Sequence, residues 1–204
     1  MSKSSNFDQS AMALVPASFV HAVKAWKIAV AQGAEGGVKT HPLTVGGAEV
    51  MLQMQGCASP VDASSLSGGP RKTLTLRLPQ VWDEPFGLME TAMIKEVAAK
   101  SATLFGKQLS ETELLEIYKP ITKKQGDYPR NLRVKVNLDG FYACRYWDGE
   151  RKKAETPVVH TGLVFNVAMR LRSLWISADS SSWGVVCEAT DLQILTQQVA
   201  DCPF

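Results

Sequence analysis

Positively charged and aromatic side chains interleave along residues 119–172, a combination typical of surfaces that bind single-stranded nucleic acid. Cations can pair with backbone phosphates, while planar rings can stack on unpaired bases. The segment contains twelve lysines and arginines against five aspartates and glutamates, whereas the whole chain has a formal charge of only +2. The aromatic residues among these cations are Tyr128, Phe141, Tyr142, Tyr146, Trp147 and Phe165.

The cations fall in segments with the two-residue period of β-strands, which would place them together on one face. In residues 132–136 every second residue is apolar, and Arg133 and Lys135 occupy the positions between. Successive side chains of a strand point to opposite faces, so these two cations should point away from the apolar side. Residues 163–172 alternate in the same way and should carry Arg170 and Arg172 on their polar face.

A hairpin is expected next to this basic strand. Asp139-Gly140 is a typical hairpin turn, so we expect residues 141–147 to return as a second strand. Asp148-Gly149 then turns into a basic loop at residues 151–153. The predicted nucleic-acid-binding residues are Arg133, Lys135, Tyr142, Arg145, Trp147, Lys152, Lys153, Arg170 and Arg172.

A different interpretation of the same pattern stays open. Lysine and arginine commonly decorate the solvated face or edge of a sheet without binding anything. The rings could equally belong to the hydrophobic core. The aromatic content is what favours nucleic acid, because alternation should bring some rings onto the basic face, where stacking on a base contributes about 1–3 kcal/mol.

The elements that must position these residues are mainly strands. Residues 1–17 are expected to form a flexible arm, and short strands are expected within 19–31 and 43–55, followed by a surface loop at 57–70. Residues 71–78 alternate strictly between polar residues and leucine, which predicts a half-buried strand. The closing strand should cover residues 183–195.

Two helices interrupt the strands. Apolar residues at helical spacing, after the start signal Asp83-Glu84-Pro85, predict a helix of about five turns that runs up to Gly106. Ser110 and Glu113 form a capping-box signature ahead of a second, short helix. The methionines of the first helix should fill the core.

This order of elements predicts a mainly β (α+β) protein. An antiparallel oligonucleotide/oligosaccharide-binding (OB) barrel with an inserted helix is the expected architecture, and a β-sandwich is the competing one. We expect one domain over residues 18–196, followed by a tail at 197–204.

Several functional classes lack support in the sequence. No apolar run is long enough to cross a membrane and the N-terminus lacks a signal-peptide pattern, so we expect an intracellular protein. The four cysteines and three histidines are scattered, which indicates neither a metal site nor a disulfide framework, and no cofactor is expected. Cys144 and Cys187 should behave as small hydrophobic residues. No nucleophile or phosphate-loop motif is present, which favours a non-enzymatic protein.

The order of these motifs over residues 70–196 resembles the single-stranded DNA-binding proteins of podophages and of nucleocytoplasmic large DNA viruses. The segments that carry the resemblance are 74–78, the long helix, Tyr118-Lys119-Pro120, Tyr128-Pro129, 132–136, Phe141-Tyr142, Trp175 and Gly184-Val185. The resemblance implies an OB fold with an inserted helix and binding without sequence preference, in viral DNA replication, recombination or repair. It also implies a nuclear or cytoplasmic viral replication site.

Members of that family end in an acidic tail whose terminal aromatic residue docks replication partners. This chain ends in Asp201-Cys202-Pro203-Phe204, which keeps the terminal phenylalanine but has only one acidic residue nearby. The resemblance therefore implies that Phe204 docks a polymerase or helicase. A homodimer is left open.

The prediction is a sequence-independent single-stranded DNA-binding protein. An RNA-binding protein and an interaction domain whose basic face meets an acidic protein remain the alternatives.

Overall fold

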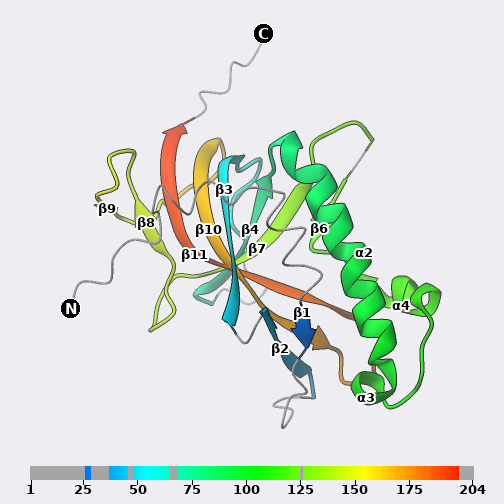
Figure 1. Ribbon diagram of the computed structural model, residues 1–204. Helices are drawn as coiled ribbons and strands as arrows, with labels where there is room; N and C mark the ends of the chain where they lie inside the picture. Colours follow the sequence, from blue (N-terminus) through cyan, green and yellow to red (C-terminus); the bar gives the residue numbers. More distant parts are fainter. Residues whose placement is uncertain (1–25, 29–36, 46–47, 65–68, 125, 198–204) are drawn as a thin grey trace.

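The computed structural model describes residues 26–28, 37–45, 48–64, 69–124 and 126–197, and these form one large sheet with helices beside it (Figure 1). The predicted arm at 1–17 and the end of the predicted tail, including Phe204, lie outside the described residues. The helices are η2 (Gln80–Trp82), α2 (Asp83–Ala99), α3 (Ser101–Phe105) and α4 (Glu111–Ile117). The strands are β1 (Trp26–Ile28), β2 (Lys39–Val45), β3 (Ala48–Ala58), β4 (Arg71–Arg77), β5 (Tyr118–Lys119), β6 (Thr122–Lys123), β7 (Asn131–Asn137), β8 (Arg145–Trp147), β9 (Lys153–Ala154), β10 (Leu163–Ile176) and β11 (Trp183–Gln197).

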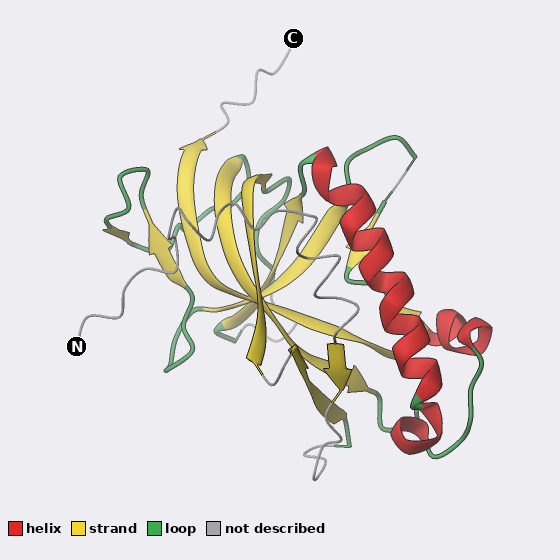
Figure 2. Ribbon diagram, viewed as in Figure 1, coloured by secondary structure: helices red, strands yellow, loops and turns green. Residues whose placement is uncertain are grey.

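Five of the strands pair in a closed cycle, which we call the strand cycle. β3 pairs with β4, β4 with β7, β7 with β11, β11 with β10, and β10 with β3. Most of these pairs are antiparallel as predicted, but β11 pairs in parallel with β5, β7 and β8. α2 runs along one side of the strands, and β8 and β9 lie on the other side (Figure 2).

Much of the predicted element order is confirmed. β4, β10 and β11 match the predicted strands, and α4 begins with the predicted capping box between Ser110 and Glu113. The long helix is shorter than predicted, because α2 ends at Ala99 and α3 completes the segment. Gly106 follows α3 with a φ of 75°, a left-handed conformation that favours glycine and ends the helix.

The predicted hairpin of residues 132–147 is wrong. β4 occupies one edge of β7, and β6 and β11 occupy the other, so β7 has no free edge for a returning strand. Asp139-Gly140 does turn, but residues 138–144 form a loop, and β8 pairs instead with β11 and β9. The loop leaves Phe141 and Tyr142 exposed.

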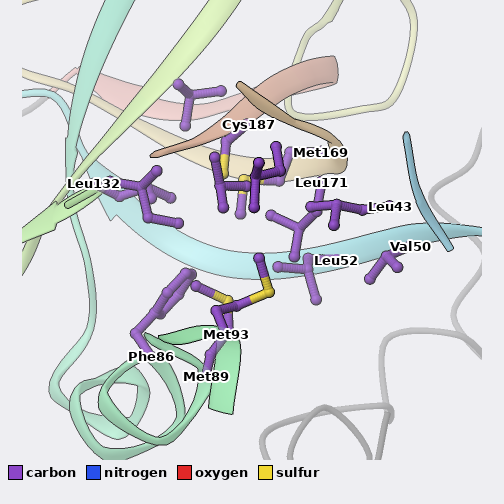
Figure 3. Close-up of a cluster of buried hydrophobic side chains, with 14 of the residues drawn as sticks. Leu43, Val50, Leu52, Phe86, Met89, Met93, Leu132, Met169, Leu171 and Cys187 are labelled. Atoms are coloured by element: carbon purple, nitrogen blue, oxygen red, sulfur yellow. The ribbon is translucent and has the colours of Figure 1, made fainter. Parts of the chain in front are cut away.

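The core lies between the inner faces of the strands and α2. Phe86, Met89 and Met93 recur at helical spacing on α2 and are buried against the strands, as Figure 3 shows beside Leu52 of β3. The predicted role of these methionines as core residues is confirmed. Cys144 and Cys187 are also buried with free thiols, and burial raises the pKa of both, which makes them inert hydrophobic residues as predicted.

Polar side chains attach α2 to the segment before β7. Asp83 accepts a hydrogen bond from Lys124 Nζ at 2.8 Å and lies 4.0 Å from Arg130 Nε. About two turns further along the helix, Glu90 accepts a hydrogen bond from Thr122 Oγ1 at 3.0 Å and pairs with Arg130 Nη1 at 3.4 Å. These contacts fix α2 to the segment that leads into β7.

We expect Asp83→Asn to lower the melting temperature at pH 7 but to have less effect near pH 3. The hydrogen bond from Lys124 holds the pKa of Asp83 below its usual range, and Arg130 contributes to the same shift. A depressed pKa stabilises the folded state above the unfolded value of about 4, and this contribution is lost as pH falls through the folded pKa. Thermal unfolding of both proteins at the two pH values tests it. An equal loss at both would show that the carboxylate charge is not responsible, and exposed Asp127→Asn is the control.

Candidate nucleic-acid interface

The outer face of β10 and β11 brings together several of the predicted binding residues. Arg170 and Arg172 come from β10, Arg145 begins β8, and Tyr142 comes from the loop before it. These side chains meet around two carboxylates of β11, Glu188 and Asp191, which are among the most buried polar residues described. The sequence patterns did not identify either carboxylate as part of the site.

Glu188 is the centre of the first group of contacts. Its side chain is 1% exposed, and its Oε2 accepts hydrogen bonds from Arg170 Nη2 and Arg172 Nη1, each at 3.1 Å. Arg170 Nε donates to the same oxygen at 3.2 Å, and the Asn137 side-chain amide donates to Oε1. One buried carboxylate therefore fixes two guanidinium groups.

Both guanidinium groups lie against the ring of Tyr142. The central carbon of Arg170 is 5.0 Å from the ring centroid and that of Arg172 is 5.9 Å from it, within the range of cation–π contacts. Tyr142 is nevertheless 56% exposed, and neighbouring Phe141 meets it edge-on with a centroid separation of 5.1 Å. The result is an aromatic platform that is supported by cations and open to solvent.

Asp191 is the centre of a second, similar group. It is fully buried, its Oδ2 accepts a hydrogen bond from Arg145 Nη2 at 2.8 Å, and its Oδ1 forms an ion pair with Arg145 Nε at 2.8 Å. The same carboxylate accepts a hydrogen bond from Trp147 Nε1 at 2.9 Å, and the Arg145 guanidinium lies 5.8 Å from the Trp147 ring centroid. Trp147 is therefore fixed by its polar edge and only partly exposed.

A β-bulge places both carboxylates on one face. Glu188 and Asp191 are three residues apart, so strict alternation would point them to opposite sides of β11. Glu188 pairs with Arg170 and Asp191 with Ala168, which leaves Thr190 as an extra residue in β11. Thr190 Oγ1 donates to the Ala168 carbonyl at 3.2 Å. The bulge thus re-aims the strand, a common role of bulges beside functional sites.

A groove of about 590 Å³ lies over this face. Its floor includes Arg170, Glu188 and Thr190, and Tyr142 and Arg145 line the wall formed by the loop and β8. The opposite wall comes from β3. We call this the β11 groove, and its remaining lining residues are Glu49, Met51, Phe141, Ala143 and Ala189.

A second set of cations lies beside the groove on β4 and β7. Arg133 and Lys135 point outward, as predicted, and Lys135 is the residue of β7 that pairs with Glu188. Lys135 Nζ donates to Thr73 Oγ1 at 2.7 Å. Burial lowers the pKa of Lys135, and nearby Arg71 and Arg133 lower it further.

Sequence reasoning missed two cations of this surface, Arg71 and Arg77 of β4. They occupy the same alternate positions as Thr73 and Thr75, which pair with Lys135 and Arg133. The signal was present in the alternation of residues 71–78. Neither β4 nor β7 contains an acidic residue, so their outer face is wholly basic and neutral.

The remaining predicted residues lie elsewhere. Lys152 is exposed and forms an ion pair with Glu150 at 2.7 Å, and Lys153 pairs with Trp147 in the β8–β9 ladder. Neither lysine lines the β11 groove.

Two rings that were candidates for the basic face are core residues. Tyr146 is buried beside His160, with its hydroxyl 3.0 Å from His160 Nε2, and Phe165 is fully buried.

Other kinds of site find no support in the described part of the chain. No group of three or more histidines, cysteines or acidic residues there could hold a metal ion. None of the helices described has both the length and the apolar character needed to cross a membrane.

Comparison with solved structures finds phage single-stranded DNA-binding proteins. The gp2.5 protein, a single-stranded DNA-binding protein encoded by bacteriophage T7, is 15% identical with a TM-score of 0.51, over 72% of this chain and 86% of that chain. The single-stranded DNA-binding protein from bacteriophage Enc34 is 11% identical with a TM-score of 0.44, over 87% of this chain and 96% of that chain. No protein-family model and no curated protein matches the sequence. The resemblance to phage single-stranded DNA-binding proteins is thus confirmed at the level of the fold.

Proposed function

We propose that this chain is a non-enzymatic single-stranded DNA-binding protein that binds without sequence preference. Bases would stack on Tyr142 in the β11 groove, while the cations of β4 and β7 would pair with phosphates. The observation that carries the proposal is the exposed Tyr142 ring beside two arginines in a groove large enough for a base.

We also propose that the strand cycle is an OB barrel. The cycle consists of β3, β4, β7, β10 and β11, which we number 1 to 5 in chain order. Their pairings close the cycle in the order 1-2-3-5-4, with strand 4 paired back to strand 1. A closed cycle of this kind supports a barrel over the competing sandwich, whose two sheets would keep separate edges.

Titration of fluorescent oligo(dT), oligo(U) and duplex DNA at two salt concentrations tests the proposed function. We expect oligo(dT) to bind more tightly than duplex, because stacking needs bases that are already unpaired. Equal affinity for duplex and single strands would reduce the site to a cationic patch. Tighter binding of oligo(U) would favour an RNA-binding protein, and no binding to any of them would favour an acidic protein partner. We further propose that the protein acts in DNA replication, recombination or repair, which expose single strands.

Arg133→Ala and Lys135→Ala should each lower the salt dependence of oligo(dT) binding. A cation that neutralises one phosphate contributes about 0.7 to the slope of log affinity against log salt for a single strand. We therefore expect each variant to lose about that amount. Lys107→Ala, an exposed lysine in the loop after α3, is the matched control and should keep the wild-type slope. Unchanged slopes for the two β7 variants would move the phosphate path away from β4 and β7.

A further inference from the structure

The β11 groove contains an arrangement that electrostatics alone does not explain. A surface binds a polyanion more tightly when it carries fewer negative charges. Yet the buried Glu188 lines the groove, and its carboxylate pairs with Arg170, which also lines the groove, and with Arg172.

Geometry supplies a reason for this carboxylate. Arginine side chains have many rotamers, and fixing one of them costs conformational entropy. Glu188 binds Arg170 through two nitrogens and Arg172 through one, and both cations are thereby kept within 6 Å of the Tyr142 ring centroid. A ring that these contacts already hold in place loses less conformational entropy when a base stacks on it.

We propose that Glu188 is a positioning residue for the Tyr142 platform, acting through Arg170 and Arg172, and that its contribution to DNA affinity is favourable despite its charge. The inference rests on the proposed function and names the residue that prepares the site for a base. A second carboxylate, Asp191, lies three residues further along β11. It makes the same kind of contacts, to the Arg145 guanidinium and the Trp147 ring of β8.

A double-mutant cycle between Glu188 and Tyr142 tests the proposal. Glu188→Gln keeps the size of the side chain but removes the charge. In the otherwise wild-type protein we expect oligo(dT) affinity to fall on the order of tenfold, a typical coupling for residues in one network. In a Tyr142→Ala background the same substitution should cause no loss, since there is no ring left to position.

Glu49→Gln is the matched control. Glu49 also pairs with Arg170, at 3.4 Å, but its side chain is 67% exposed on the rim of the groove. Because Glu49 lines the groove and would repel phosphate, removing its charge should raise the affinity for oligo(dT). A fall in affinity for Glu188→Gln beside a rise for Glu49→Gln separates positioning from charge.

A second variant covers the case in which Glu188→Gln does not fold, as judged by thermal unfolding. Arg170→Lys keeps the net charge but loses the planar group that Glu188 binds through two nitrogens. Its loss of affinity should likewise disappear in the Tyr142→Ala background. Unchanged or higher affinity of the folded variants, or an equal loss in both backgrounds, would overturn the proposal. Failure of the proposed function is distinct, because the wild-type protein would then not bind oligo(dT).

Discussion

Tyr142→Ala is expected to weaken oligo(dT) binding by about 1–3 kcal/mol, the range for loss of one base-stacking ring. The salt slope should stay as in the wild type, because no cation is removed. Thermal stability should also be nearly unchanged, since Tyr142 is 56% exposed and lies in a loop. Fluorescence titration at two salt concentrations, with a melting curve for each protein, measures all three quantities.

Two further variants make this result specific. Tyr142→Phe should retain most of the affinity, because the ring and not the hydroxyl carries the stacking. Tyr128→Ala removes a ring that is 72% exposed but does not line the β11 groove, and it should bind as the wild type does. If Tyr142→Ala kept full affinity, the groove would not be the base-binding site. Trp147→Ala gives a less direct test, because it also removes a hydrogen-bond donor from buried Asp191.

Trp183→Ala should destabilise the fold by about 3–5 kcal/mol, the usual cost of deleting a large buried aromatic side chain. Trp183 is fully buried at the start of β11, and its ring centroid lies 4.6 Å from the ring centroid of Tyr118. Its Nε1 also donates to the Leu114 carbonyl of α4 at 2.9 Å, so the variant leaves a buried acceptor without this donor. Urea unfolding followed by circular dichroism gives the free energy.

Leu115→Ala is the control for this prediction. Leu115 follows Leu114 on α4 but is 58% exposed, and a surface truncation should change stability by no more than about 0.5 kcal/mol. A loss for Trp183→Ala as small as that of Leu115→Ala would mean that α4 does not depend on the indole.

The sequence predicted the elements better than their partners. Local signals sufficed for the start of α2, for the capping box of α4 and for the alternation in β4, β7, β10 and β11, because each depends on neighbours within a few residues. Strand pairing depends on which edges other strands already occupy. Asp139-Gly140 does form a turn, as predicted. The returning strand cannot pair with β7, because β4, β6 and β11 occupy both of its edges.

The candidate site was predicted in part for a related reason. Alternation found Arg133 and Lys135, because side chains two residues apart on a regular strand point to the same face. It also found Arg170 and Arg172, two residues apart on β10. It could not find Glu188 and Asp191 as a pair, since an odd spacing of three implies opposite faces and the extra residue appears only in the pairing with β10. Burial of Tyr146 beside His160 likewise depends on a contact between residues 14 apart.

The bulge at Thr190 adds one residue to β11 without changing which side chains face the groove. If Thr190 were deleted, Glu188 and Asp191 would be two residues apart, so strict alternation would keep both on the groove face and Leu192 in the core. Loss of the bulge at constant length would have the opposite effect, because Asp191 would then turn toward the core and Leu192 toward the groove. During evolution this stretch of the chain should therefore shorten by one residue more readily than it loses its bulge at constant length.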